Sequence, residues 1–327
     1  MFHCQELKRQ AENSLNRSPC DPKRLLRIHV GVMTAASLLL TVIHYVLQMQ
    51  IDATGGLSGI ATRSILSTIS TVLQLIFFVL TPFWQAGYIG VALAISRGEP
   101  ADTDHLFSGL RRFGTILRLY LLQGLILGAL FMVSNYLSSF LYMLTPWGRD
   151  MMGQLTQILE QTDGAPTEEA LSTLAGHGLP MLILGGIVFL VIAIPTFYRM
   201  RLSLYRIMDG ENRALRAILE SAKLTKGRWF CLMKLDLSFW WFYAAEVAIG
   251  LIAYADVLLE LAGYTLPWSE AVRFFVPYGA YLLLQFIFQL WQKNRVDVTY
   301  AHAYGIFSTP VNPQQEPKNL PWKDSFS

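Results

Sequence analysis

The sequence predicts an all-α, polytopic membrane protein with six transmembrane helices. Hydrophobic residues make up 53% of the 327 residues and charged residues only 15%, whereas soluble domains contain about 25% charged residues. The apolar residues gather in six segments, each long enough to cross a hydrocarbon core, which takes about 20 residues of helix. The basic residues alternate between the connecting segments, as the loops of a membrane protein do.

Residues 1–27 are predicted to form a cytoplasmic N-terminal segment. A short charged helix is expected over residues 5–17, where Leu7, Ala11 and Leu15 recur at four-residue spacing and form a narrow apolar stripe. Two prolines follow and should end this helix. The segment has no apolar core and no cleavage site of small residues, so we expect the first hydrophobic segment to remain as a helix.

A six-span membrane domain is predicted over residues 28–307, followed by a proline-rich tail over 308–327 that is expected to be disordered. Three prolines inside the spans, Pro82, Pro195 and Pro277, predict kinked helices. The predicted spans are residues 28–51, 65–96, 116–141, 180–205, 230–251 and 271–291.

The connecting segments have their own patterns. Residues 106–118 are predicted to form a short amphipathic segment at the membrane surface, and residues 145–178 a polar loop with a helix that starts after Thr167.

A weak internal repeat links the prolines to the ends of their spans. Pro82 stands sixteen residues before Gly98, Pro195 fifteen before Gly210, and Pro277 sixteen before Lys293. The chain is therefore either three helical hairpins of related design or a set of unrelated spans, because prolines are common in membrane helices.

The basic residues predict the orientation. All but three of the 26 Lys and Arg residues fall on one side of the six spans, and the exceptions are Arg63, Arg149 and Arg273. Because cytoplasmic loops are enriched in Lys and Arg, both termini are expected in the cytoplasm, with the protein in the inner (cytoplasmic) membrane.

Several segments resemble one bacterial family. They are ELKRQAENSL, GYIGVALAISRGE, LFSGLRRF, IPTFYRMRLSLY, AILESAKLTKGRWFCLMKLDLSFWWF and VTYAHAY, and they cover most of residues 5–307. The chain resembles the predicted integral membrane proteins known as "domain of unknown function 975". The most specific part runs from Ser221 to Phe239, after which Trp240-Trp241 stands where the family has Gly-Trp. The resemblance implies a multi-span membrane protein and no particular activity.

Two acidic residues, Asp236 and Glu246, lie nearest to the interior of the membrane. A carboxylate at the centre of a bilayer costs a few kcal/mol, so such residues are often functional. Asp236 lies close to the interface, where a basic residue of the 199–228 loop is the expected partner. Glu246 is deeper, and both a ligand or proton site and a structural hydrogen bond remain open for it. The two are about 15 Å apart along a helix, too far for a carboxylate dyad.

Other candidate ligand-binding residues are polar or basic. Gln285 and Gln289 share one helix face and could line a cavity. Arg199, Arg201 and Arg206 follow the kink at the fourth span, where they either bind lipid phosphates or an anionic substrate, or simply fix the orientation of the helix.

The sequence contains no arrangement that predicts a catalytic centre, a metal site or a cofactor site. The expectation is a non-enzymatic membrane protein that binds or moves a lipid or a hydrophobic peptide in the cell envelope. Membrane lipids are the expected partners, with no nucleic acid, and the kinked helices beside a basic rim motivate this hypothesis.

Two alternatives remain. One is an assembly or regulatory subunit of a larger complex, which would dock a membrane or cytoplasmic partner through the helix at 209–228, using Ala214, Ile218 and Ala222, and through the tail. The other is an intramembrane enzyme that uses Asp236 or Glu246, although no second catalytic group is spaced to assist either acid.

Overall fold

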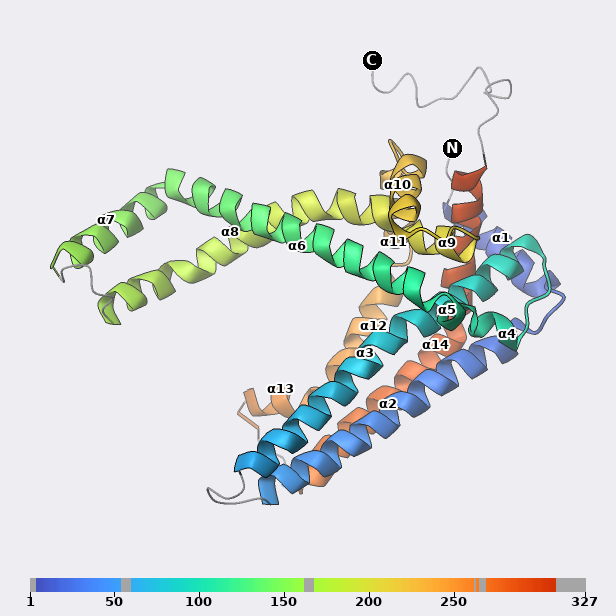
Figure 1. Ribbon diagram of the computed structural model, residues 1–327, viewed down its shortest axis with the longest axis horizontal. Coiled ribbons are helices and arrows are strands. Elements are labelled where there is room, and N and C mark those ends of the chain that lie inside the picture. The colour runs from blue at the N-terminus through green and yellow to red at the C-terminus, as the bar shows by residue number, and fades with distance from the viewer. Residues whose placement is uncertain (1–3, 54–59, 162–167, 262, 265–268, 310–327) are drawn as a thin grey trace, which may run out of the picture. The chain divides into compact units, whose positions relative to one another are not determined.

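The computed structural model is built from α-helices (Figure 1). It describes residues 4–53, 60–161, 168–261, 263–264 and 269–309, and no strand occurs among them. The helices are α1 (Cys4–Arg17), α2 (Pro22–Ala53), α3 (Ile60–Arg97), α4 (Thr103–Leu106), α5 (Ser108–Arg111), α6 (Phe113–Leu144), α7 (Pro146–Gln161), α8 (Glu168–Met200), α9 (Ser203–Met208), α10 (Ala214–Leu224), α11 (Trp229–Leu237), α12 (Trp240–Ile252), α13 (Ala255–Leu261) and α14 (Glu270–Ser308).

The helical class and the membrane spans predicted from the sequence are confirmed. Within the described residues, five stretches of helix are long and apolar enough to cross a membrane: Pro22–Ile51, Ile60–Arg97, Phe113–Leu144, Gly178–Met208 and Ala271–Ser308. A sixth span results if α11 and α12, which meet at an angle of 59°, are counted as one broken helix. The chain is therefore an all-α, polytopic helical protein.

The chain divides into two compact units. Unit 1 contains residues 1–116, 204–212 and 231–327, and unit 2 contains residues 117–203 and 213–230. The sequence predicted one membrane domain over 28–307, without this division. The expected disorder of the tail concerns residues 310–327, which lie outside the described residues.

In unit 1, α2, α3 and α14 run side by side, with α12 next to α14 (Figure 1). Aromatic rings make many of the contacts: Tyr45 of α2 stacks on Phe274 of α14 at 5.3 Å between ring centroids, and Phe242 of α12 stacks on Phe288 of α14 at 5.2 Å. Lys8 of α1 donates a hydrogen bond to the carbonyl of Ser238 at 2.6 Å, at the break between α11 and α12.

Unit 2 is a helical hairpin of α6 and α8, joined through α7, with α10 packed on α8. The hairpin is antiparallel, because Gln123 near the start of α6 donates to Ser203 after α8 (2.9 Å), while Phe131 and Phe189 meet farther along (5.6 Å). Ser221 of α10 donates to the carbonyl of Arg199 at 2.6 Å.

Local sequence sets several helix ends. The Asp21 carboxylate accepts hydrogen bonds from the backbone N–H groups of Lys23 and Arg24 (3.0 and 3.1 Å), and Pro22 occupies the first turn of α2. Asp and Pro are favoured at these two positions, because the side chain satisfies free N–H groups and proline has none to satisfy. The two prolines thus separate α1 from α2 as predicted.

The two Gly-Glu pairs of the predicted repeat end their helices in the same way. Gly98 and Gly210 have φ angles of 73° and 117°, a left-handed conformation that favours glycine. The N–H groups of Gly98 and Glu99 bond back to the carbonyls three and five residues earlier, and those of Gly210 and Glu211 do the same. Both ends are therefore Schellman caps. No such break occurs near Lys293, which lies inside α14.

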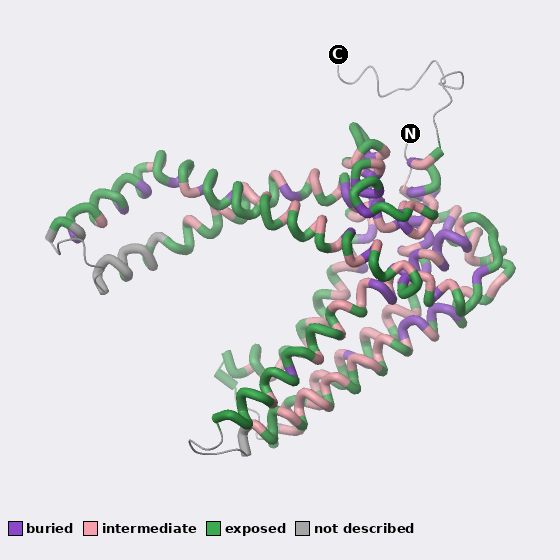
Figure 2. Tube along the Cα trace, in the orientation of Figure 1, coloured by how far each residue is buried: buried purple, intermediate pink, exposed green. Residues whose placement is uncertain are grey.

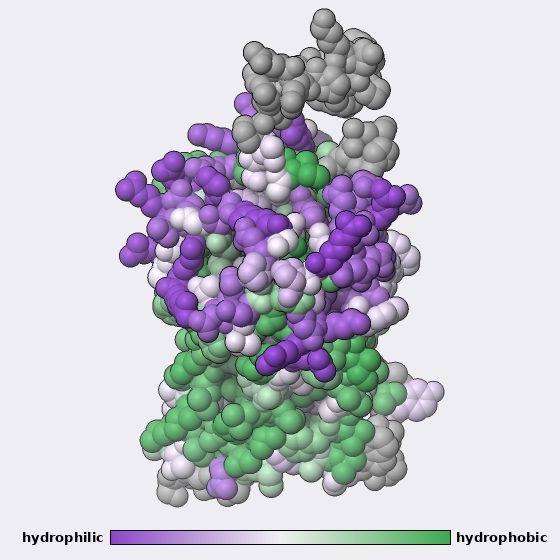
Figure 3. All heavy atoms as spheres, turned by 90° about the vertical axis from the view of Figure 1, so that its right-hand side faces the viewer, coloured by the Kyte–Doolittle hydropathy of each residue, from purple (hydrophilic) through white to green (hydrophobic). Residues whose placement is uncertain are grey.

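Most of the buried apolar residues of unit 1 gather in what we call the head region (Figure 2). The head region consists of α1, the end of α3 from Phe83, α4, α5, residues 204–212, and residues 292–308 of α14. Along the rest of α2, α3 and α14 the large apolar residues are mostly exposed. Figure 3 shows hydrophilic residues gathered at the head end and hydrophobic residues below it.

Backbone contacts hold the head region together. A Cβ atom on Gly87 of α3 would lie 1.9 Å from the carbonyl oxygen of Leu106, and one on Gly109 of α5 would lie 2.0 Å from that of Phe83. These glycines let the helices meet backbone to backbone, which the sequence did not single out. By contrast, a Cβ atom on Gly124 or Gly128 of α6 would meet no atom within 4 Å.

Three connecting segments differ from the prediction. Residues 146–161 form the helix α7 rather than a polar loop, with the Thr145 hydroxyl accepting a bond from the N–H of Gly148 at 3.1 Å. The helix expected after Thr167 does start at Glu168, but it continues into the fourth span as α8. The sixth span does not end at Trp291, because α14 runs on to Ser308.

Candidate functional site

Three of the predicted site residues come together in unit 1, between α12 and α14. The side chain of Gln285 donates a hydrogen bond to the Glu246 carboxylate at 3.4 Å, and Gln289 interacts with the same carboxylate. All three side chains are half-buried. Helical spacing explains the arrangement, because residues four apart lie on one face of α14 and that face is turned towards α12.

The four-residue spacing continues towards the head region with a mostly buried ion pair, and each step turns about 40° around the axis of α14. Lys293 and Asp297 follow Gln289 at four-residue steps, and their charged atoms are 3.3 Å apart. Their side chains are only 13% and 15% exposed. With Tyr281 at the other end, the polar row on α14 is Tyr281, Gln285, Gln289, Lys293 and Asp297, and it extends about 24 Å along the helix.

Next to this row, three helices share a hydrogen-bonded contact. The hydroxyl of Tyr88 on α3 donates to the side-chain carbonyl of Asn294 on α14, and the amide of Asn294 donates to the backbone carbonyl of Pro22 on α2 at 3.1 Å. The Lys293 ammonium lies 5.6 Å from the centroid of the Tyr88 ring. These contacts hold α14 against α2 and α3 at the end of the polar row that lies near the head region.

Asp236, the second predicted acid, is not part of the polar row. Its carboxylate accepts a hydrogen bond from the hydroxyl of Tyr243 at 3.1 Å, and Tyr243 also lies 3.4 Å from the hydroxyl of Tyr300. Asp236 therefore belongs to the break between α11 and α12. Lys8 lies at the same break, where its ammonium sits 4.0 Å from the ring centroid of Phe239 and burial lowers the pKa of Lys8.

The three predicted arginines do not belong to one compact unit. Arg199 and Arg201 are in unit 2, and Arg206 is in unit 1. Arg201 lies over the ring of Tyr198 at 5.7 Å, a cation–π contact, and the Arg199 side chain is exposed.

Arg206 belongs to a cluster around Asp209 in the head region. Its guanidinium is 3.7 Å from the Asp209 carboxylate, which also pairs with Arg97 and accepts a hydrogen bond from the hydroxyl of Tyr304 at 2.7 Å. Arg206 and Arg97 share the Asp209 carboxylate. The guanidinium of Arg206 is therefore already paired within the protein. The cluster joins the end of α3 to α9 and α14.

The chemistry available in the polar row is hydrogen bonding and charge. It offers a carboxylate, two amides and an ion pair in an otherwise apolar part of unit 1. Among the described residues, no group of three or more His, Cys, Asp or Glu side chains is placed to hold a metal ion.

Comparisons of the chain with family models, with curated proteins and with solved structures find no match in any of the three. The resemblance to the "domain of unknown function 975" proteins therefore stays a prediction from the sequence.

Sequence reasoning found Glu246, Gln285 and Gln289 but missed the ion pair of Lys293 and Asp297. A signal was present, because the four-residue spacing of the two glutamines continues through both charged residues. The charges were instead assigned to a cytoplasmic loop, since they follow the apolar segment. Nothing in the sequence pointed to the contact between Tyr88 and Asn294, which are separated by 206 positions.

Proposed function

We propose that the protein is a non-enzymatic membrane protein that binds, and moves, a lipid or a hydrophobic peptide along the polar row of α14. The observation that carries the proposal is the position of Glu246, which is hydrogen-bonded to Gln285 and faces a row of polar side chains inside an apolar helix pair. An ionisable residue within a membrane span is expensive and is commonly functional. A molecule with a polar group and an apolar body suits this surface.

The two faces of α14 support this role. The polar row is turned towards α12 and α3, while Leu283, Leu284 and Ile287 on the other side are exposed, as side chains that face lipid acyl chains are. A polar group that moves along the row would exchange one hydrogen-bonding partner for the next. It would thus avoid the several kcal/mol that an unpaired polar group costs in hydrocarbon.

Proteoliposomes containing a fluorescent lipid or a labelled hydrophobic peptide test this proposal. Glu246→Gln removes the negative charge, and we expect it to lower the movement of the probe between leaflets at least fivefold. Glu260→Gln, a change of the same kind at an exposed acid, is the matched control and should leave the rate unchanged. Equal rates in wild type and Glu246→Gln, with neither above empty vesicles, would remove the proposal.

A second function, that of an assembly or regulatory subunit, is favoured by the surface of α10. The stripe predicted to meet a partner is wrong, because Ala214 and Ile218 are buried. Two leucines four residues apart, Leu215 and Leu219, are instead exposed on this helix. Purification in mild detergent, comparing the chain with its Leu215→Ser/Leu219→Ser variant and with a truncation at residue 307, tests this function. A chain that stays alone in every case counts against it.

We also propose that the protein lies in the inner membrane of a bacterium with both termini in the cytoplasm. The basic ends of the spans support this orientation. Arg97 at the end of α3 meets the second half of α14 through Asp209 and Tyr304, and that half also carries Lys293 and Arg295, whereas Arg63 and Arg273 lie in the first turns of α3 and α14. Single cysteines at Asp150 and Arg111, in a chain whose three native cysteines are replaced by serine, test it on intact cells. Only the cysteine at 150 should react with a membrane-impermeant reagent, and the reverse result would overturn the orientation.

A further inference from the structure

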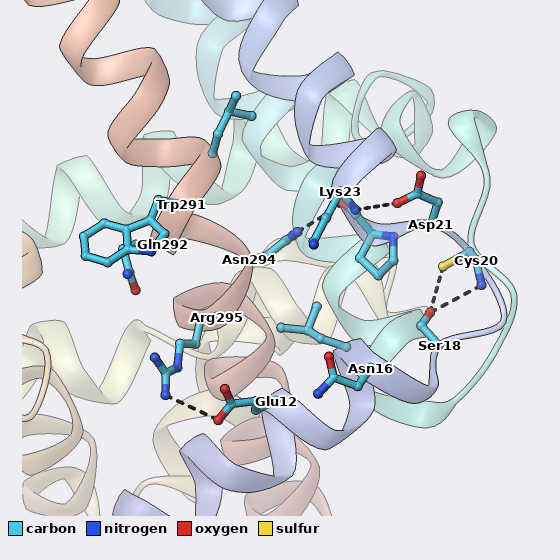
Figure 4. Close-up of a pocket in the computed structure, with 13 residues that line it drawn as sticks. Glu12, Asn16, Ser18, Cys20, Asp21, Lys23, Trp291, Gln292, Asn294 and Arg295 are labelled. Carbon is cyan, nitrogen blue, oxygen red and sulfur yellow. Dashed lines mark hydrogen bonds and ion pairs between the residues drawn. The ribbon is translucent and has the colours of Figure 1, made fainter.

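A pocket of about 540 Å³ opens in the head region, between α1, the start of α2 and α14 (Figure 4). It lies away from Glu246, and the proposed function does not use it. Its volume is within the range of small-molecule sites. The polar residues that line it are Glu12, Asn16, Ser18, Cys20, Asp21, Lys23, Gln292, Asn294 and Arg295, and the apolar ones are Leu15, Pro22, Leu290 and Trp291.

The pocket is placed at the level of a membrane surface. It lies beside Trp291, after which most apolar side chains of α14 are buried, and beside Pro22, where the first candidate span begins. Trp291 on its wall is 70% exposed. Tryptophan favours the zone between headgroups and acyl chains, so one side of the pocket faces lipid and the other faces water.

Part of the pocket already has partners. The Glu12 carboxylate is 3.4 Å from the Arg295 guanidinium, and the Asp21 carboxylate accepts the backbone N–H groups at the start of α2. Both acids are largely exposed, so the ion pair of Glu12 and Arg295 is weak and can be shared with a ligand. Figure 4 shows this pair on the side of α1, opposite Lys23.

Two groups in the pocket lack a partner among the described residues. No contact of the Lys23 ammonium is present, although this side chain lines the pocket. Gln292 is only 4% exposed, and its side-chain oxygen has no hydrogen-bond donor. The last side-chain torsion of glutamine is broad, so the oxygen can turn towards the space that the residue lines. The Lys23 ammonium can therefore bind an anionic group of a ligand. The Gln292 oxygen can accept a hydrogen bond from a donor group of the same ligand.

We propose that this pocket binds the headgroup of a phospholipid that carries both a phosphate and a primary ammonium group, as phosphatidylethanolamine does. The phosphate meets Lys23 and Arg295, and the ammonium N–H groups meet Glu12 and Gln292. Leu290 and Trp291 provide an apolar surface for the start of the acyl chains, which favours a lipid over a free phosphoethanolamine. A choline headgroup has the same charges but no N–H to donate, so it fits less well.

Native mass spectrometry of the purified chain with short-chain lipids tests the site. We expect the ethanolamine lipid to bind at least fivefold more tightly than the choline lipid. Lys23→Gln should weaken binding of the ethanolamine lipid about tenfold, the usual loss of a charge-assisted contact. Arg24→Gln, the same loss of charge at the next residue, does not line the pocket and should have no effect. Gln292→Met should remove the preference for ethanolamine over choline, with circular dichroism showing that the variant is folded.

Four results would overturn the inference. Equal binding of the ethanolamine and choline lipids would show that the donor group is not recognised, and so would tighter binding of an anionic glycerol headgroup. Equal effects of Lys23→Gln and Arg24→Gln would show that only general charge matters. Competition by soluble phosphoethanolamine at the same concentration as the lipid would show that the occupant is not a lipid. Glu246→Gln should leave all these preferences unchanged, so failure of the proposed function would be seen separately.

Discussion

The two halves of α14 belong to one continuous helix of 39 residues but face different solvents. In the half before Trp291, most large aliphatic side chains are exposed, and Leu283 is 61% exposed. In the half after it, most apolar side chains are buried, and Val298 is 0% exposed. Lipid tails are as apolar as leucine, so the first half gains little from burying leucine. The second half lies at the polar end of unit 1 and packs against α1 and α3, because water drives apolar side chains inward.

The polar side chains show the opposite pattern. In the first half, Tyr281, Gln285 and Gln289 begin the polar row, which is turned towards α12, because a polar group in hydrocarbon needs a partner. In the second half, polar residues such as Arg295 are exposed, and the buried Asn294 links α14 to α2 and α3. Exposure of an apolar side chain therefore has a different meaning in the two halves of α14. Five experiments test the difference between the head region and the rest of the protein.

The largest effect is expected from the glycine contact in the head region. Gly87→Ala would place its Cβ 1.9 Å from the backbone of Leu106, so it should reduce the free energy of unfolding by more than about 3 kcal/mol. Gly279→Ala in the first half of α14 meets no atom within 4 Å and should be neutral or slightly stabilising. Unfolding in a detergent titration measures both. Equal effects would show that the two regions pack alike.

The buried ion pair comes next. Asp297→Ala leaves the Lys293 ammonium in a site that is mostly closed to water, which should cost about 3 kcal/mol of stability. The double variant Lys293→Met/Asp297→Ala should recover most of this loss, because no charge is left unpaired. Glu12→Ala, at an exposed pair, should cost less than about 1 kcal/mol in the same unfolding assay. If the double variant is no more stable than Asp297→Ala, the loss does not come from an unpaired Lys293 ammonium.

Leucine-to-alanine changes compare the stability cost of losing a buried leucine in the head region with that of losing an exposed leucine in the first half of α14. Leu106→Ala removes a fully buried side chain from the head region and should cost about 2–4 kcal/mol. Leu283→Ala removes an exposed side chain in the first half of α14 and should cost less than about 1 kcal/mol. Thermal unfolding of the purified variants in lipid nanodiscs gives both values. A larger loss at Leu283 would show that this face is covered by protein.

A hydrogen bond at Asp209 should have a smaller effect. Tyr304→Phe removes only the hydroxyl that donates to the carboxylate at 2.7 Å, so we expect a loss of about 1–2 kcal/mol. Asp209 keeps its contacts with Arg97 and Arg206 in this variant. Tyr136→Phe, at an exposed tyrosine of unit 2, is the control and should change nothing measurable. Equal losses in the two variants would contradict a role for this bond.

The smallest effect concerns Asp102, the capping residue of α4. A hydrogen bond from His105, whose ring nitrogen is 2.7 Å away, lowers the pKa of the Asp102 carboxyl below its ordinary 3.8. A lowered pKa means that its stabilising contribution is present above pH 3.8 and is lost as the pH falls through the folded-state pKa. An NMR titration of the carboxyl should show this shift. His105→Ala should return the pKa of Asp102 towards 3.8. An unchanged pKa would show that the hydrogen bond from His105 does not cause the shift.

The spans and several helix ends could be predicted without the structure. Segment length and hydrophobicity are properties of consecutive residues, and they locate the five helices that are long and apolar enough to cross a membrane and the bent pair of α11 and α12. Asp21 with Pro22, and the Gly98 and Gly210 caps, are equally local signals. The stripe of Leu7 and Ala11 also correctly marked the buried face of α1.

Other features of the fold and of the candidate site depend on contacts between residues that are distant in the sequence. The extension of α14 to Ser308 was missed because a charged segment after an apolar one resembles a loop, and only packing against α1 and α3 buries its Val298 and Tyr304. The pairing of Glu246 with Gln285 was suggested only in part, since helical spacing places Gln285 and Gln289 on one face but cannot say which helix that face meets. The division into two units has no local signal either.

Which segments are long and apolar enough to cross a membrane follows from consecutive residues, because transfer of apolar side chains into lipid is a property of each segment. Tertiary structure alone decided which polar side chains meet, such as Tyr88 with Asn294 and Lys293 with Asp297, and where Gln292 and Lys23 line a pocket. The physical reason is that a buried polar group is stable only beside a partner, and that partner comes from another helix or another turn whose position is set by packing.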